Sequence, residues 1–311
     1  MKATYFTFLL IFFVTHGVQA EKLAHIANLK QLTFNENSIA PSFSPTNSSL
    51  LAFTSSKYQG IYVLHLTKGL NMLGSTVQDP EPLTNAPQAG FEFSWSPDGK
   101  FIISRFSVGA QTRLGMFDLQ TRQYIDVSGN AQSISIPTLR QQQMFFTQNN
   151  IDFMLSLNQP SSSKKLQAFQ VKQQSLPLLE KEGDILVGHQ KVNREGSQCW
   201  LPNVSPDGMK VAFECWEGLY IYHIHPRNLI FIGRGADPSW SRDSQLLVYE
   251  KTTDNGYDLV SSDIYMIHND GTQQINLTRA YSKTARRPAL SPDSKQVAMD
   301  IDGDIYVGDI Q

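Results

Sequence analysis

The chain has 311 residues, 17% of them charged, and a formal net charge of −2 at neutral pH. This weakly acidic composition predicts no general attraction to nucleic acid or to anionic lipid. The length is enough for one large domain or two smaller ones.

The first predicted element is an export signal over residues 1–20. Lys2 is followed by an uncharged run over residues 5–14, and Val18, Gln19 and Ala20 provide small or apolar side chains before a cleavage position. We expect cleavage after Ala20, which leaves residues 21–311 as a single domain in the periplasm or outside the cell. No transmembrane segment is expected after cleavage. An uncleaved membrane anchor is the alternative.

A hairpin motif then recurs along the chain. Residues 91–103 (FEFSWSPDGKFII) return as residues 201–213 (LPNVSPDGMKVAF), and weaker copies begin near residues 40, 237 and 287. Each copy has a short apolar strand, a turn and a second apolar strand. Proline sets the φ angle that a β-turn needs, and Asp-Gly tolerates left-handed geometry. The motif therefore predicts a β-hairpin.

The spacing of these hairpins predicts the number of repeats. Their serines are Ser44, Ser96, Ser205, Ser241 and Ser291. The interval from Ser96 to Ser205 is 109 residues (205 minus 96), about twice the intervals of 52 and 50 residues near the two ends. One degenerate repeat is therefore placed inside it, at residues 136–147, which makes six units.

A third and a fourth strand follow each hairpin. The third is predicted at residues 60–63, 114–117, 218–221, 263–266 and 304–307, where β-branched and aromatic residues gather. The fourth ends in Leu-Thr pairs at residues 83–84 and 277–278. Four antiparallel strands repeated about every 50 residues are typical of propeller blades. The predicted fold is all-β, a six-bladed β-propeller of four-stranded antiparallel blades.

The N-terminal segment is predicted to close the ring. The last repeat reaches Gln311 without an outer strand of its own, and residues 24–33 end in a Leu-Thr pair like the other outer strands. We expect this segment to complete the last blade, because a closed ring leaves no sheet edge open to aggregation.

The Ser-Pro-Asp-Gly hairpins, with Pro-x-Trp or Pro-x-Phe before them and Asp-Ile-Tyr strands after them, resemble the propeller repeats of TolB. The resemblance covers residues 32–311. TolB carries an α/β domain ahead of its propeller, and the segment between Glu21 and the first repeat has no room for one. The resemblance therefore implies a periplasmic, propeller-only relative. The partnership of TolB with a peptidoglycan-associated lipoprotein transfers to no residue of this chain.

The two cysteines flank one hairpin symmetrically. Its turn is centred near Asp207, midway between Cys199 and Cys215. In an antiparallel pair these residues lie opposite each other with α-carbons about 4.5–5.5 Å apart, which is within disulfide range. We predict a disulfide; a register shift of one residue would instead leave two buried thiols.

Candidates for catalysis are few. A serine-hydrolase motif of the Gly-x-Ser-x-Gly type is absent from the sequence. His223 and His225 share one face of a predicted strand and suggest either a metal site or a solvated face. The acids of residues 300–304 suggest either a cation loop or a turn. No catalytic, cofactor-binding or metal-binding residue is predicted, and no cofactor.

The predicted binding site is one rim of the propeller, where the loops entering the innermost strands gather. Its residues are Arg279, Tyr281, Lys283, Arg286, Arg287, Trp200 and Phe91. Four cations beside aromatic residues favour an anionic partner; a solvated basic loop is the alternative. We expect a monomeric binding or scaffold protein that engages a protein or cell-envelope partner. The alternative is a metal-assisted lyase or hydrolase acting on a saccharide at the channel.

Overall fold

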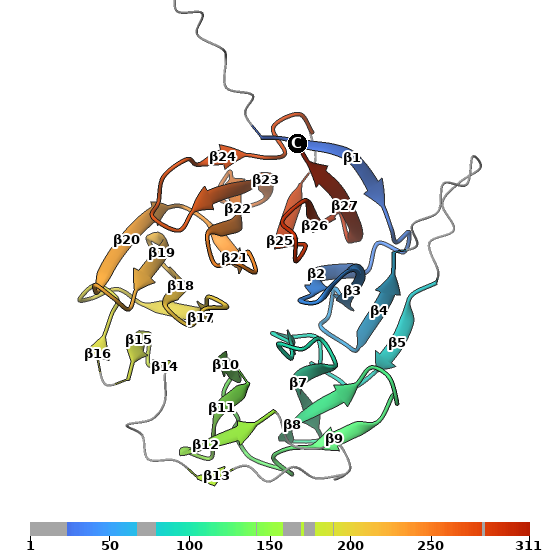
Figure 1. Ribbon diagram of the computed structural model, residues 1–311, viewed down its shortest axis with the longest axis vertical. Coiled ribbons are helices and arrows are strands. Elements are labelled where there is room, and N and C mark those ends of the chain that lie inside the picture. The colour runs from blue at the N-terminus through green and yellow to red at the C-terminus, as the bar shows by residue number, and fades with distance from the viewer. Residues whose placement is uncertain are drawn as a thin grey trace, which may run out of the picture.

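The computed structural model describes residues 24–66, 79–140, 142–157, 169–170, 178–188, 190–281 and 284–311. The predicted signal at residues 1–20 lies outside these ranges. The described chain is all-β, and its sheets stand around a central axis as the blades of a propeller (Figure 1). None of its segments is a helix of the length and apolarity that crossing a bilayer takes.

Each sheet is a meander that starts at the axis and moves outward. The innermost strands are β2 (Ser38–Ser44), β6 (Ser94–Trp95), β10 (Thr138–Arg140), β14 (Leu179–Lys181), β17 (Cys199–Val204), β21 (Ala236–Trp240) and β25 (Ala285–Leu290). The second strands are β3 (Asn47–Ser55), β7 (Phe101–Val108), β11 (Gln143–Gln148), β15 (Asp184–Val187), β18 (Lys210–Cys215), β22 (Leu246–Asp254) and β26 (Gln296–Ile301).

The third strands are β4 (Ile61–His65), β8 (Gln111–Asp118), β12 (Ile151–Ser156), β16 (Gln190–Lys191), β19 (Gly218–His223), β23 (Leu259–His268) and β27 (Asp304–Ile310). The outermost strands are β5 (Glu81–Thr84), β9 (Tyr124–Asp126), β13 (Phe169–Gln170), β20 (Asn228–Gly233), β24 (Ile275–Asn276) and β1 (Ile26–Gln31).

The six four-stranded blades predicted from the repeats are confirmed, including the degenerate hairpin β10–β11. The described chain also contains a three-stranded sheet, β14–β15–β16, which stands in the ring between β10–β13 and β17–β20 (Figure 1). The sequence did not predict this sheet. Its first turn is formed by Glu182 and Gly183 and lacks the Ser-Pro-Asp-Gly motif, so the long interval holds two degenerate repeats.

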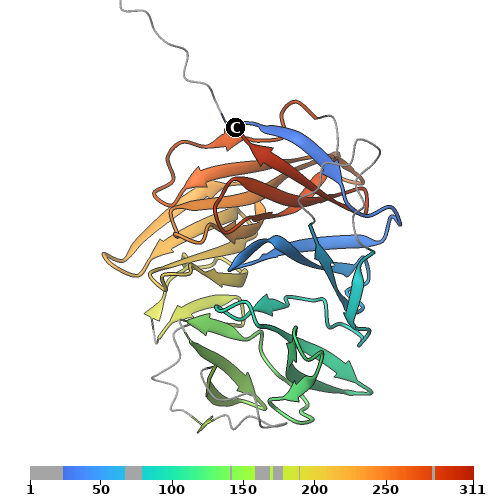
Figure 2. The same ribbon diagram turned by 45° about the vertical axis from the view of Figure 1, so that its right-hand side comes forward.

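The predicted ring closure is confirmed. The N-terminal β1 pairs antiparallel with the C-terminal β27, with Ile26 opposite Ile310 and Gln31 opposite Tyr306. Figure 1 shows β1 along the outside of β27, and Figure 2 shows that the two ends of the described chain meet at one blade. Without β1, the polar backbone groups along the outer edge of β27 would have no strand to pair with.

The recurring serine holds the hairpin turn. Ser96 Oγ donates to Asp98 at 2.6 Å and accepts the Phe101 N–H at 2.9 Å. Gly99 follows with φ of +72°, the left-handed conformation that glycine adopts without strain. The same serine–aspartate bond occurs at Ser205, Ser241 and Ser291. The repeated motif therefore builds the turn.

The Leu-Thr and Asp-Ile-Tyr motifs pair with each other in the last two blades. Thr278 Oγ1 donates to Asp263 at 2.8 Å and accepts the Ile264 N–H at 2.9 Å. Thr33 makes the equivalent bonds to Asp304 and Ile305, at 3.0 and 2.8 Å. The threonine thus joins the outer strand to the start of the third strand, and β1 fills its position in the last blade like any other outer strand.

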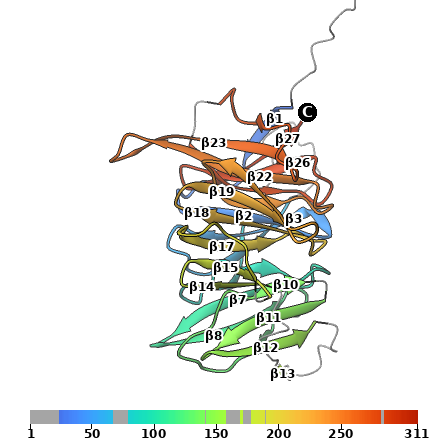
Figure 3. The ribbon, with the colours of Figure 1, turned by 90° about the vertical axis from the view of Figure 1, so that its left-hand side faces the viewer.

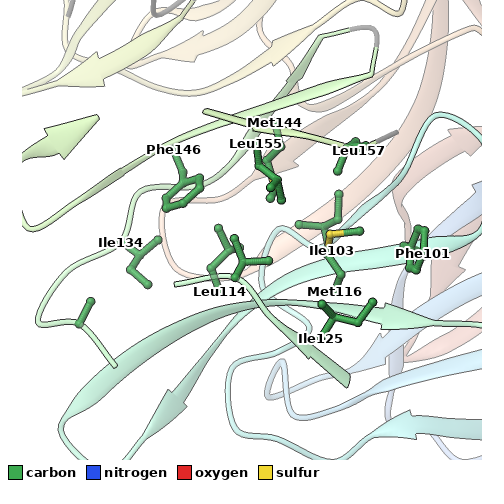
Figure 4. Close-up of a cluster of buried hydrophobic side chains, with 12 residues drawn as sticks. Phe101, Ile103, Leu114, Met116, Ile125, Ile134, Met144, Phe146, Leu155 and Leu157 are labelled. Atoms are coloured by element: carbon green, nitrogen blue, oxygen red, sulfur yellow. The ribbon is translucent and has the colours of Figure 1, made fainter. Parts of the chain in front are cut away.

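The apolar core is divided into clusters that lie between neighbouring sheets. Figure 4 shows one of them, in which Ile103 and Met116 of one blade face Met144 and Leu155 of the next. Trp95 and Trp240 also bond across blades: their indole N–H groups donate to the carbonyls of Ser42 and Asn203. Adjacent blades are therefore held together by side chains, and the axis is left as a channel.

Candidate functional site

The channel has two different ends. The innermost strands of the six four-stranded blades begin at one end, here called the front rim, and the Ser-Pro-Asp turns lie at the other, the back rim. β14 runs the opposite way, because Gly183 in the turn after it accepts the N–H of Cys199, the first residue of β17. The hairpins β7–β8 and β22–β23 extend on the front-rim side (Figure 3). The channel encloses about 1000 Å³ and is lined by residues of the innermost strands from both ends.

A repeated backbone feature lies where the channel meets the front rim. Five non-glycine residues that lie in or just before an innermost strand have left-handed φ, between +46° and +55°, and line the channel: Ala40, Glu92, Leu201, Asp237 and Arg287. In β2, β17, β21 and β25 the pairing with the second strand shifts at this point, as in a β-bulge. Bulges re-aim side chains, and left-handed backbone in non-glycine residues concentrates at functional sites.

Three buried carboxylates hold this ring of bulges in place. Glu214, Glu250 and Asp300 are at most 8% exposed. Glu214 accepts the Asp237 N–H at 2.8 Å, Glu250 accepts the Arg287 N–H at 2.8 Å, and Asp300 accepts the Ala40 N–H at 3.2 Å. In each case the bulge belongs to the following blade, so the carboxylates connect neighbouring blades at the channel.

Two of the arginines predicted to grip a partner are held by these same carboxylates. Arg287 donates to both oxygens of Asp300, at 2.7 and 2.6 Å. Arg286 donates to Glu250 at 2.9 and 3.2 Å. Both guanidinium groups are thus paired within the channel wall.

Two other carboxylates line the channel without such partners. No described residue donates a hydrogen bond to the side chain of Glu92 or of Asp237, and Asp237 interacts electrostatically with Glu92. Burial, reinforced by the charges of Glu250 and Glu214, raises the pKa of Asp237 well above its ordinary value. Burial also raises the pKa of Glu92, against the opposing effect of Arg105.

These two residues were not predicted from the sequence. In four of the five bulges the left-handed residue precedes the proline of the repeat: Ala40, Leu201, Asp237 and Arg287. That position differs in every copy, although the turn beside it is nearly constant. Variation at one position of a constant repeat is the signal that points to these residues.

The other predicted rim residues separate into two places. Trp200 stacks edge-on against Trp216, with ring centroids 5.4 Å apart, and Phe91 packs in the same way against Tyr58 at 5.2 Å. Arg279 is exposed and does not line the channel. The Tyr281 hydroxyl donates to the Ile26 carbonyl, which places this ring beside β1. Lys283 lies outside the described residues.

Exposed apolar side chains gather at the front rim. Trp216 is 80% exposed and Tyr257 at the tip of β22–β23 is 96% exposed. The other exposed large apolar residues of this rim are Phe34, Phe91, Val108, Ile151, Leu259 and Val260. Elsewhere in the described chain only Met209, at a back-rim turn, and Phe231, on the outer strand β20, are comparably exposed.

The cysteines lie directly beneath the tryptophan pair. Cys199 is opposite Cys215 in the β17–β18 ladder, with α-carbons 4.0 Å apart and the sulfur atoms joined at 1.94 Å. Each cysteine precedes one of the stacked tryptophans, Trp200 and Trp216. The linked strand ends therefore support the aromatic pair on the rim.

The candidate ligands for cations are used within the fold. His223 Nε2 lies 2.8 Å from the Asn269 carbonyl, and His225 is exposed. Asp304 accepts hydrogen bonds from Thr33, Asn35 and Glu36, so residues 300–304 form a turn. Across the described part of the chain, no three His, Cys, Asp or Glu side chains come together in a way that would hold a metal ion.

No family model and no curated protein matches the sequence. Solved structures are similar in fold. An oligogalacturonate lyase in complex with manganese is 13% identical with a TM-score of 0.59, covering 92% of this chain and 95% of that one. The Cps50 (Swd1) β-propeller domain of Myceliophteria thermophila is 10% identical with a TM-score of 0.57, covering 93% and 100%.

TolB from Acinetobacter baumannii is 17% identical with a TM-score of 0.55. The match covers 84% of this chain and 59% of that chain, so this chain spans less than two thirds of that TolB. Sequence identities this low establish the fold alone. The described chain is a TolB-like β-propeller in fold. It shares that fold with the oligogalacturonate lyase and with the Cps50 (Swd1) domain, so the fold does not identify a function.

Proposed function

We propose that this chain is an exported binding protein that engages a protein or cell-envelope partner through the front rim of its propeller. Residues 1–20 would be the export signal and residues 21–311 the mature domain, in the periplasm or outside the cell. The observation that carries the proposal is the concentration of exposed apolar residues on the front rim. Contiguous exposed apolar surface, especially aromatic, is a mark of interaction sites.

The residues of this rim suit recognition better than catalysis. Trp216 and Tyr257 are large, amphipathic and exposed, as interface anchors are in unbound proteins. The buried carboxylates Glu214, Glu250 and Asp300 are engaged with bulge N–H groups, and the last two also pair with arginines of the fold. The similarity to TolB supports a protein-binding role. The similarity to a lyase leaves a saccharide-cleaving enzyme as the alternative, and metal analysis of the purified chain together with an assay on oligogalacturonate tests it.

The experiment places a photo-crosslinking amino acid on the rim and elsewhere. Trp216→p-benzoylphenylalanine and Tyr257→p-benzoylphenylalanine probe the front rim. Met209→p-benzoylphenylalanine and Phe231→p-benzoylphenylalanine are matched controls, because Met209 and Phe231 are exposed apolar residues away from it. Irradiation in cells that express the chain should link the two rim variants, and neither control, to the same discrete product. Equal crosslinking from all four positions would refute the front rim as the binding surface.

A further inference from the structure

The side chains that face a ligand at the channel entrance carry a net negative charge. The charged side chains lining it at the front-rim end are Glu92, Glu180, Glu214, Asp237, Arg105 and Arg287. Arg287 is neutralised by Asp300, which lies behind the wall. Four carboxylates and one guanidinium remain, a balance of −3 when all are ionised. Since Arg286 is also paired, with Glu250, the surplus charge of this entrance is acidic.

Two of these carboxylates are not used by the described fold. Glu214 accepts a hydrogen bond from the Asp237 N–H. Glu92 and Asp237, in contrast, accept no hydrogen bond from the described residues. Both have a left-handed backbone conformation and line the channel. Arg105 of the same blade as Glu92 donates to the Ile134 carbonyl at 2.7 Å and interacts electrostatically with Glu92, while its buried Nε has no hydrogen-bond partner.

Glu92 is exposed within the channel and Asp237 is partly exposed, so a ligand that enters can reach both carboxylates. Because the channel walls exclude part of the water around these groups, an ionised carboxylate gains more there from pairing with a cation than it would on an open surface. A cation placed between Glu92 and Asp237 would supply charge-assisted hydrogen bonds to both. The channel volume of about 1000 Å³ is large enough for more than an inorganic ion. The apolar residues of the front rim surround this entrance, so a chain that inserts a cation would also meet Trp216 and Phe91.

We propose that the channel entrance binds a positively charged group, a lysine or arginine side chain or a free amino terminus, on an apolar peptide segment of the partner protein. This proposal rests on the proposed function and specifies its ligand. It reverses the charge that the basic residues of the sequence suggested for the partner, because two of those residues are consumed in ion pairs. The partner segment presents the cation to Glu92 and Asp237 and its apolar side chains to the rim.

The test is selection of peptides from a random heptapeptide display library by the full mature chain. The wild type should enrich lysine and arginine over the input library. The variant E92Q/D237N should lose that enrichment. The control E36Q/D258N removes the same charge from two exposed front-rim acids that do not line the channel, and it should select the same peptides as the wild type.

A selected basic peptide then provides the quantitative measurement. Its affinity should fall at least about tenfold in E92Q/D237N, the loss of one good charge-assisted hydrogen bond or more, and stay within about twofold in E36Q/D258N. Replacing its lysine with norleucine should weaken binding to the wild type and leave binding to E92Q/D237N unchanged.

Selection of acidic or uncharged peptides, no selection at all, or equal selection by E92Q/D237N would overturn the proposal. The proposed function fails separately. If W216A weakens peptide binding while E92Q/D237N leaves it intact, the rim binds partners and only the cation site is wrong.

Discussion

Asp237 is destabilised in two ways at once. Its φ of +50° is unfavourable for a residue with a side chain, and its partly exposed carboxylate lies in the channel near other acids, with no hydrogen-bond donor among the described residues. Asp300, which is only 2% exposed, has Arg287 and the Ala40 N–H as partners. Asp300 therefore stabilises the ring, whereas Asp237 lowers the stability of the fold, as a residue kept for binding would.

The first prediction is that D237N stabilises the chain at neutral pH. The pKa of Asp237 is higher in the folded state than the value of about 3.9 for an unfolded aspartate. The unfolded chain therefore releases this proton first as pH rises. The free energy of unfolding falls from about pH 4 until the folded pKa is reached, and the full loss remains at higher pH. Thermal unfolding should show D237N melting a few degrees above wild type at pH 7.

The pH dependence of this gain is the control. At about pH 3 the aspartate is protonated in both states, so the charge contribution to the gain should vanish. A gain of equal size at both pH values would trace it to the backbone preference of asparagine for left-handed conformations.

The second prediction concerns the Arg287–Asp300 pair, whose side chains are 17% and 3% exposed. R287M leaves Asp300 buried without its charge partner, and breaking a buried pair in this way costs about 3–5 kcal/mol. Urea denaturation should show a loss of that order. The double variant R287M/D300N should recover much of it, because no charge then remains buried. If the loss in R287M/D300N equals the sum of the losses in R287M and in D300N, the result contradicts the pairing.

The hairpin and the outer strand are the elements that the sequence describes best. Ser96 and Asp98 are two residues apart and bond directly, so the turn they build is visible locally. The sheet β14–β16 shows the limit of this method. Its strands are two to four residues long and no Ser-Pro-Asp-Gly turn joins them. Only residues 183–188 (GDILVG) repeat part of another blade, residues 303–308 (GDIYVG), which is too short a match to reveal a separate sheet.

The third prediction is that removing residues 21–33 abolishes soluble monomer. The deletion strips β1 from β27 and removes Thr33, which holds Asp304 and Ile305. An open edge strand associates with other chains. Size-exclusion chromatography and thermal melting compare this truncation with one that removes only residues 21–23, ahead of β1. Cooperative melting of the longer truncation near the full-length temperature would mean that β1 is dispensable for closure.

At the scale of the whole molecule, the ring brings together charges from distant parts of the sequence. The channel entrance combines Glu92, Glu214 and Asp237 from three blades, and the apolar rim draws on nearly all of them. Binding and stability oppose each other here. D237N should stabilise the fold and weaken the cation site, a trade-off expected where a site is built from unfavourable groups.

The fourth prediction is that affinity for a basic peptide falls as pH falls from about 8 to about 5. Burial raises the pKa of both Glu92 and Asp237, so they lose charge at higher pH than ordinary carboxylates. Titration calorimetry with the selected peptide should show this loss in wild type and a flat profile in E92Q/D237N. An equal slope in both would assign the titration to another carboxylate whose pKa burial raises: Glu180, Glu214 or Asp300. The neighbouring Arg105, Arg287 and Tyr58 keep one charge state over this pH range.

The sequence by itself determined the blade, the six four-stranded repeats and the closing strand. These depend on local chemistry: a serine that bonds two residues ahead, a proline that sets φ, and a strand pattern that recurs. The facing positions of Cys199 and Cys215 also followed from the centre of one hairpin.

Only the tertiary structure decided the fate of the charged residues. Arg287 and Glu250 are 37 positions apart, and Ala40 and Asp300 are 260 apart, yet each pair is hydrogen-bonded where adjacent blades meet. A basic cluster in a sequence does not reveal which acids the ring will bring against it. Because Coulombic and hydrogen-bond partners are set by distance in space, the four cations expected to bind an anion could not be assigned until the ring was closed.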